Sequence, residues 1–170
     1  MRLFSGRVSP IAVEVVRVLT ASKDIETESP REVIADVEAV LKTYLQTEKD
    51  VNERTKELLD RTGRPMTEYG RVRQQIAESK GIKVGDDALD YLLDQIVEIF
   101  HHSANVDEIY VEDVELRRKM APVFKKHMSE DTELDAEVRA QLRHLSEGSR
   151  AWEVEYARVL SEVKRRRGLS

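Results

Sequence analysis

Apolar residues recur along the chain at spacings of three, four and seven residues, which is the period of amphipathic helices. The longest such stripe covers residues 30–61 and is built on apolar positions seven residues apart, namely Val37, Tyr44, Val51 and Leu58. Gly63 suits a left-handed helix cap and Pro65 cannot continue a helix, so both mark an end. The pattern therefore predicts one long helix over residues 30–61.

The start of this helix carries a capping sequence. The Ser29 side chain can accept a hydrogen bond from a first-turn amide, and Pro30 fits the first helical position. Glu32 can reach back to the amide of Ser29. Together these three residues predict a capping box.

Similar patterns predict further helices at about residues 10–21, 67–80, 86–102, 112–128, 132–145 and 150–167. A strand is the alternative for residues 10–21, because four valines in this stretch favour extended structure. Pro122 should kink the helix that contains it. The predicted fold class is all-α, a helical bundle.

The two halves of the chain, residues 1–83 and 84–170, have similar patterns. When Val40 is placed on Val123, apolar positions of the first half meet apolar positions of the second at a constant offset of 83. Identical residues are few, so either a duplication or a coincidence of helical period accounts for the match. The prediction is two related helical halves, with one continuous core or two separate cores as the alternatives.

Length and composition restrict the class of protein. A chain of 170 residues can bury roughly 70% of its unfolded surface, which is enough for one self-sufficient core. The lack of cysteine excludes disulfides, thiolate catalysis and cysteine-ligated metals, and fits a reducing cytoplasm. The N-terminus lacks a signal peptide's apolar run, and no stretch approaches the roughly 20 apolar residues of a membrane span. We therefore expect a soluble cytoplasmic protein without a membrane partner.

Charge narrows the classes of partner. A net charge of −5 gives no general attraction to nucleic acid or anionic lipid, so any such binding has to be local. Two segments are locally basic, and their candidate nucleic-acid contacts are Arg61, Arg64, Arg71, Arg73, Lys164, Arg165, Arg166 and Arg167. The alternative is a solvated surface, with the last four residues complementing the dipole of a helix end.

Three segments resemble a known bacterial family. They are the N-terminal run of residues 1–12, the connector Asp24-Ile25-Glu26 and the run of residues 35–45. On these segments the chain resembles the family catalogued as domain of unknown function 507, most clearly over residues 1–63. The resemblance implies a small, helical, cytoplasmic bacterial protein and supplies no catalytic residue.

The histidines provide one candidate metal motif. Glu98 and His101 have the Glu-x-x-His spacing of carboxylate-bridged di-metal sites. Such a site needs a second motif of the same kind, and neither His127 nor His144 has a glutamate three positions earlier. We therefore expect His101 and His102 to meet the negative end of a helix dipole, and we expect no metal and no cofactor. His127 is expected to be partly buried and hydrogen-bonded.

Catalytic motifs are missing from the sequence. It contains neither a glycine-flanked nucleophile elbow nor a phosphate-binding loop. We therefore predict no catalytic residue. An enzyme whose site is assembled from scattered polar residues stays an alternative.

Trp152 and Tyr156, one helical turn apart, are the candidate partner-binding residues. They can also dock the last helix onto the core, which is the more usual role of a sole tryptophan. A rich helical framework without a catalytic constellation favours a protein–protein interaction or adaptor module with an unknown protein partner. A nucleic-acid or ribosome-associated factor is the main alternative.

Overall fold

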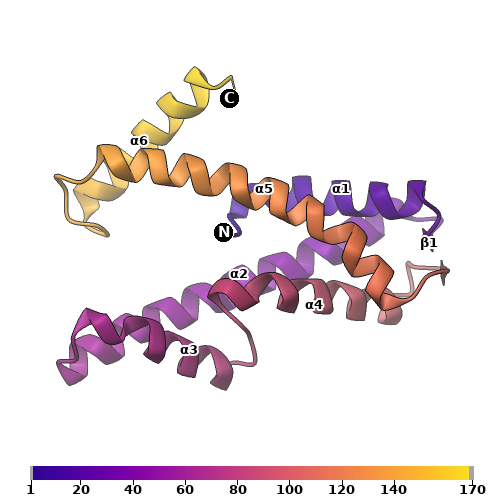
Figure 1. The fold of residues 1–170 in the computed structure, drawn as a ribbon, viewed down its shortest axis with the longest axis horizontal. Coiled ribbons are helices and arrows are strands. Elements are labelled where there is room, and N and C mark those ends of the chain that lie inside the picture. The colour runs from indigo at the N-terminus through magenta and orange to yellow at the C-terminus, as the bar shows by residue number, and fades with distance from the viewer. Residues whose placement is uncertain (1, 169–170) are drawn as a thin grey trace.

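The computed structural model describes residues 2–168, which are almost entirely helical (Figure 1). Short 3-10 turns at Ser5–Arg7, Met66–Glu68 and Gly85–Asp87 lead into three of the helices. The α-helices of this part of the chain are α1 (Val8–Ala21), α2 (Pro30–Thr62), α3 (Tyr69–Ser79), α4 (Ala88–His102), α5 (Asp113–Gln141) and α6 (Arg150–Arg166). The prediction of an all-α helical bundle is confirmed.

Four helices form the body of the molecule. α1 packs on α2 and α5, and α4 packs on the same two helices, so α2 and α5 occupy one diagonal of the body. The core between them contains fully buried side chains from both halves of the chain, among them Ile11, Val15, Val37, Leu41, Ile96, Leu116 and Phe124. Burial of this apolar surface is the main stabilising contribution to such a bundle.

The two long helices continue beyond the body, and each carries a shorter helix. α3 packs on the far part of α2, and α6 packs on the far part of α5. We refer to residues 52–79 as the first arm and to residues 129–166 as the second arm. In Figure 1 the arms diverge from the body, and the N-terminal residues lie between them. The second arm has a small core of its own, made of Leu134, Val138, Leu142, Val159 and Val163.

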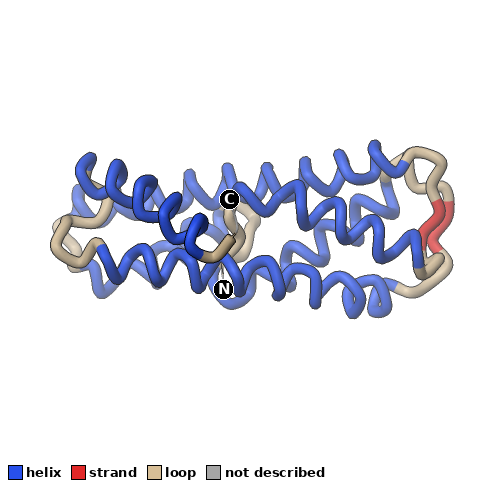
Figure 2. Tube along the Cα trace, turned by 90° about the horizontal axis from the view of Figure 1, so that it is seen from above, coloured by secondary structure: helices blue, strands red, loops and turns tan. Residues whose placement is uncertain are grey.

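A short ribbon joins the two halves at the end of the body away from the arms (Figure 2). β1 (Ile25–Glu26) pairs antiparallel with β2 (Glu108–Ile109), and Ile25 lies opposite Ile109. The order helix, strand, long helix and shorter helix thus occurs twice along the chain, first in α1–β1–α2–α3 and then in α4–β2–α5–α6.

Asp24, immediately before β1, ties the ribbon to α5. Its buried carboxylate accepts hydrogen bonds from Lys119 Nζ at 2.6 Å and from Ser22 Oγ at 2.5 Å. Burial alone would raise the pKa of Asp24, but these two hydrogen bonds hold it below its ordinary value. The carboxylate is therefore kept in its charged form.

Helix α2 follows its sequence prediction closely. It begins at Pro30 and ends at Thr62, and Gly63 adopts the left-handed conformation with a φ of 66°. Residues 10–21 lie in α1, so the strand considered there is not formed. Pattern and end signals agree in α2, which is why its boundaries were predictable.

The prediction of a capping box is wrong in its hydrogen bonds. Ser29 precedes α2, but its side chain makes no capping bond. Thr27 organises this turn instead, because its Oγ1 accepts from the Ser29 amide at 2.9 Å and donates to the Asn105 carbonyl at 2.6 Å. The Ser29 amide is thus satisfied by Thr27, and Glu32 is not needed for it.

The prediction of separate helices at 112–128 and 132–145 is also wrong. Helix α5 is continuous from Asp113 to Gln141. Pro122 lies inside it, and the helix bends in its first half (Figure 1).

Contacts from the N-terminal segment support the polar stretch where α5 was expected to break. Arg7 Nε donates to Asp131 Oδ1 at 2.9 Å, and the Arg2 amide donates to Thr132 Oγ1 at 3.3 Å. These partners lie more than 120 residues away in sequence. The local pattern alone therefore could not reveal the continuity of α5.

Candidate functional site

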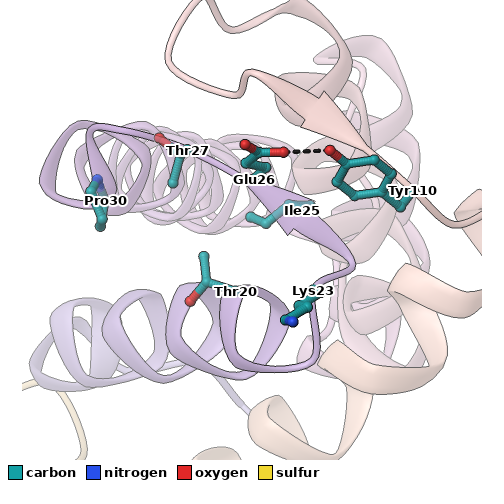
Figure 3. Close-up of a pocket in the computed structure, with 7 residues that line it drawn as sticks. All are labelled: Thr20, Lys23, Ile25, Glu26, Thr27, Pro30 and Tyr110. Atoms are coloured by element: carbon teal, nitrogen blue, oxygen red, sulfur yellow. Dashed lines mark hydrogen bonds between the residues drawn. The ribbon is translucent and has the colours of Figure 1, made fainter.

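A groove beside the ribbon is the first candidate binding site. It has a volume of about 560 Å³ and lies between the end of α1 and the start of α2 (Figure 3). Pockets of this size accommodate small ligands or single large side chains. The residues that line it are Thr20, Lys23, Ile25, Glu26, Thr27, Pro30 and Tyr110.

The groove combines apolar surface with a polar rim. In Figure 3, Thr20 and Pro30 point into the space between α1 and α2. The Tyr110 ring is largely exposed, and its hydroxyl donates to the Glu26 carboxylate, which raises the pKa of Tyr110. Lys23 has a φ of 59°, a left-handed conformation that is uncommon for a residue other than glycine.

The second hollow is a cleft between the arms, with a volume of about 710 Å³. It is bounded by α2, by the N-terminal residues and by Glu153 of α6. Three lysines of α2, each seven residues after the last, line this cleft. We refer to Lys42, Lys49 and Lys56 as the lysine row. Because seven residues make about two helical turns, these side chains lie on one face of α2.

The lysine row is only weakly neutralised. Lys42 Nζ lies 3.7 Å from Glu38, an exposed pair of the kind that contributes little. Among residues 2–168, Lys49 and Lys56 have no ion pair. The cleft therefore presents ammonium groups that are available to a partner.

A buried polar cluster lies next to the cleft. Glu48 is 8% exposed, and its Oε2 lies 3.4 Å from both Arg73 NH2 and the Tyr44 hydroxyl. The Tyr44 hydroxyl donates to the Lys83 carbonyl at 3.0 Å, and Arg73 Nε donates to Asn52 Oδ1 at 2.7 Å. Burial, with the nearby carboxylate second, raises the pKa of Tyr44. This hydroxyl is therefore a hydrogen-bond donor rather than an acid at neutral pH.

A second buried network surrounds His127, which is hydrogen-bonded as predicted and is buried more deeply than the partial burial expected from the sequence. His127 is 7% exposed, with Nε2 at 2.7 Å from Glu14 Oε2 and Nδ1 at 3.1 Å from Arg7 NH1. The hydrogen bond with His127 lowers the pKa of Glu14. Because Arg7 can only donate, its contact fixes Nδ1 as an acceptor and places the proton on Nε2. The network joins α1, the N-terminal segment and α5.

The two adjacent histidines of α4 have different partners. His101 Nε2 lies 2.7 Å from Asp113 Oδ1, and His102 Nε2 lies 3.0 Å from Glu98 Oε2. Glu98 thus pairs with His102 and not with His101. Within the described chain, no group of three or more potential ligands from His, Cys, Asp and Glu comes together around a metal-sized space.

Three of the four candidate nucleic-acid contacts in the first arm are engaged in ion pairs. Arg64 and Arg71 both approach Glu68, at 3.7 and 2.9 Å, and Arg73 pairs with Glu48 at 3.4 Å. Arg61 has no ion pair within the described chain.

Two of the basic residues at the C-terminal end of α6, Arg166 and Arg167, contact α5. Arg167 NH2 lies 2.6 Å from Glu137 Oε2, and Arg166 NH2 lies 3.8 Å from Glu137 Oε1. Lys164 and Arg165 have no ion pair with any residue that the structure describes. The two basic segments lie on different arms, so each would act separately.

Trp152 and Tyr156 pack into the small core of the second arm. Their rings stack with centroids 5.0 Å apart, and the Tyr156 hydroxyl donates to Asp135 Oδ1 at 2.5 Å. The Arg139 guanidinium lies over the Trp152 ring, 5.3 Å from its centroid. These contacts dock α6 onto α5, and a role in partner binding stays a prediction.

Sequence reasoning missed the cleft and the cluster behind it. The seven-residue spacing of the lysine row could have indicated one basic face of α2, because it has the same period as the stripe of apolar residues along this helix. Glu48 and Arg73 carry no comparable signal, since they lie 25 residues apart on different helices. Their proximity follows from the packing of α3 on α2.

The helices of the described chain lack the combination of length and apolar composition that crossing a membrane requires. The family described as protein of unknown function (DUF507) matches residues 1–169, essentially the whole chain. A search among curated proteins finds no match. The chain belongs to the DUF507 family.

Proposed function

We propose that this member of the DUF507 family is a protein–protein interaction module, and that the cleft between its arms receives an acidic segment of a protein partner. The observation that carries the proposal is the lysine row along the cleft, with Lys49 and Lys56 free of ion pairs within residues 2–168. Complementary charge steers association and selects among partners.

The dimensions of the cleft fit a helical or extended peptide. Lys42 and Lys56 are 14 positions apart, which spans about 21 Å along α2 and corresponds to about four turns of a partner helix. Phe4 and Leu45 are half-buried apolar residues in the same cleft and supply contacts for apolar side chains of that segment. An amphipathic segment seated in a groove is a common mode of peptide recognition.

The carboxylates of the cleft do not cancel its positive charge. Glu48 is engaged by Arg73, as described above. Lys42 is likewise paired with Glu38, which leaves Glu53 and Glu153 beside three cationic residues, Arg2, Lys49 and Lys56. The remaining excess favours an acidic partner over a basic one.

Site-specific photo-crosslinking tests this proposal. A photoreactive amino acid at Gln46, an exposed residue of the cleft, should crosslink to a protein in nuclease-treated lysate of the source organism. The same amino acid at Ala104, in the exposed turn at the ribbon end, should not. Position dependence is the informative result, because non-specific contacts would label both sites.

Charge variants complete this experiment. Lys49→Glu with Lys56→Glu should abolish the crosslink from position 46, because the acidic segment would then be repelled. Lys80→Glu with Lys125→Glu makes the same charge change at exposed lysines that line neither the groove nor the cleft, and should leave the crosslink intact. Equal labelling from both positions would contradict the proposal. Loss of the crosslinked species on nuclease treatment would favour the nucleic-acid alternative.

We also propose that residues 1–83 and 84–170 are related units. The repeated order of elements supports this, and so does the ribbon, in which the two strands of the two halves face each other around a local twofold arrangement. Such a relationship suits an interaction module with two similar arms.

A further inference from the structure

The spacing of the lysine row restricts the shape of a segment that can bind along it. Seven residues of α2 rise by about 10.5 Å, so Lys42, Lys49 and Lys56 follow one another at about that interval along the cleft. Seven residues also fall about 20° short of two full helical turns, so the row winds slowly around α2. A segment that contacts every lysine must match both the interval and the winding.

A second helix matches both. Its acidic residues lie opposite the row when they are seven positions apart, because the two helices have the same rise per residue. Helices that cross at about 20° keep such rows in contact over several turns, as they do in coiled coils. Half-buried Leu45 lies between Lys42 and Lys49 on the same side of α2, where a partner helix can present an apolar residue.

An extended segment matches the row less well. A β-strand covers about 10 Å in three residues, and residues three apart point to opposite faces of a strand. A strand can therefore place carboxylates against Lys42 and Lys56, but not against Lys49 between them. Lys49 has no ion pair among residues 2–168, so a bound strand would leave a free ammonium group unmatched.

The volume of the cleft indicates how much of a helix it can receive. A helix about 10 Å across and about 21 Å long occupies roughly 1,600 Å³, whereas the cleft has a volume of about 710 Å³. Less than half of such a helix therefore enters the cleft, and its other face stays in water. The helix that fits is amphipathic, with its acidic and apolar residues on the seated face.

We propose that the cleft recognises an amphipathic helix whose acidic residues recur every seven positions, with apolar residues between them that face Leu45 and Phe4. This inference rests on the function proposed above, which requires only an acidic segment, and it adds the conformation and the register of that segment. Lys42 lies 3.7 Å from Glu38 in an exposed pair, which a carboxylate of the bound helix can replace.

Synthetic peptides of equal composition test the register. In the matched peptide three glutamates are seven positions apart, and in the control they are five positions apart, which turns them to three different faces of a helix. NMR titration of the ¹⁵N-labelled full chain at low ionic strength should show the matched peptide binding roughly fivefold or more tightly, because the control can pair with only one lysine at a time. This preference should shrink as salt is added.

A proline-rich peptide tests the extended alternative. A glutamate at every third position keeps the carboxylates on one side of a polyproline II helix. This peptide should bind no more tightly than the control peptide. Tighter binding than that of the matched peptide would overturn the helical conformation.

A charge-conserving swap on α2 tests the register from the side of the protein. Gln46→Lys with Lys49→Gln keeps the net charge and changes the intervals of the row from seven and seven to four and ten. Gln46 is an exposed residue of the cleft, and its hydrogen bond to Asp50 at 3.3 Å is exposed as well, so the swap should leave the fold intact. The swapped protein should bind the matched peptide roughly fivefold more weakly.

Reordered peptides should restore binding to the swapped protein. Recovery with glutamates at intervals of four and then ten would show that the bound helix runs parallel to α2, and recovery with ten and then four would show that it runs antiparallel. Equal affinities for all peptides of the same charge, or no recovery with either order, would overturn the register. If the crosslink from position 46 persists in that case, the acidic segment of the proposed function stands without the helix. A register preference in a protein that forms no crosslink would support the helix and reject the partner proposed above.

Discussion

His101 Nε2 and Asp113 Oδ1 lie 2.7 Å apart, and this pair bridges the end of α4 and the start of α5. In the proposed relationship between the two halves, which pairs α1 with α4 at an offset of 81 residues and α2 with α5 at an offset of 83, the residues that correspond to His101 and Asp113 are Thr20 and Pro30. Those two residues line the open groove beside the ribbon. If the two halves are related as proposed, the place that an ion pair closes in the second half is an open groove in the first.

The His101–Asp113 pair should contribute little to the free energy of unfolding. Its side chains are 47% and 57% exposed, so water and salt screen the attraction. A double-mutant cycle with His101→Ala and Asp113→Ala should give a coupling energy below about 1 kcal/mol that falls as salt is added. The pair of His102 and Glu98 is the matched exposed control. A coupling above about 2 kcal/mol would show that this bridge is shielded from solvent.

Val37→Asp should destabilise the protein severely. Val37 is fully buried between the helices of the body, where an aspartate would have no partner for its charge. We expect a loss of more than about 4 kcal/mol, or a failure to fold, measured by urea denaturation. Ala35→Asp, at an exposed position of the same helix, should stay within about 0.5 kcal/mol of the wild type. Similar stability of the two variants would refute the packing of α2 described here.

Removing the Thr27 hydroxyl should cost more than removing the Ser29 hydroxyl. Thr27→Val leaves both the Ser29 amide and the Asn105 carbonyl without their partner, so a loss of about 1–2 kcal/mol is expected. Ser29→Ala removes no capping hydrogen bond and should cost less than about 0.5 kcal/mol. Thermal or urea denaturation of the two variants gives the comparison. A larger loss of stability in Ser29→Ala than in Thr27→Val would support the capping box instead.

The fold was largely readable from the sequence because helical period is a local property. Residues 30–61 show it clearly, and α2 begins and ends within one residue of this range. The capping box failed for a different reason. The conformation of the turn before α2 is set by Asn105, which lies 78 residues from Thr27. Local rules give way where a distant segment supplies a stronger hydrogen bond.

The cleft and the polar cluster next to it could not be predicted from the sequence. Glu48 and Arg73 meet because α3 folds back along α2, and Phe4 lines the cleft only because the N-terminal residues lie between the arms. Neither arrangement leaves a spacing in the sequence. Trp152 and Tyr156 show the opposite case, since their spacing predicted one shared face and the structure stacks them. The hydrophobic period of a sequence therefore predicts which residues share a helix face, whereas the contacts of that face depend on tertiary packing.

The buried Asp24 should make stability depend on pH. Its pKa is lower in the folded protein than its ordinary value of about 3.9, so its contribution is complete above that value and is lost as pH falls through the folded pKa. Asp24→Asn should therefore be less stable than the wild type at pH 7, by about 1–3 kcal/mol, with the difference shrinking below about pH 4. Urea denaturation between pH 3 and pH 7 measures this. Asp86→Asn, at an exposed aspartate, is the control, and a pH-independent difference for Asp24→Asn would contradict the ion pair with Lys119.

Substitution of the basic residues at the C-terminal end of α6 should show whether they stabilise the second arm or contact nucleic acid. Arg166 and Arg167 both reach Glu137 of α5, so Arg166→Gln with Arg167→Gln should loosen the second arm by up to about 1 kcal/mol. Hydrogen exchange of the amides of α6 measures this loosening. Lys164→Gln with Arg165→Gln changes the same charge without breaking an ion pair among residues 2–168, and should leave exchange unchanged. If the segment binds RNA or DNA, both double variants should instead weaken that binding and lower its dependence on salt, since each phosphate contact adds about 0.7–0.9 to the slope of log affinity against log salt. We expect the first result, because Arg167 already has a carboxylate partner, Glu137, at 2.6 Å.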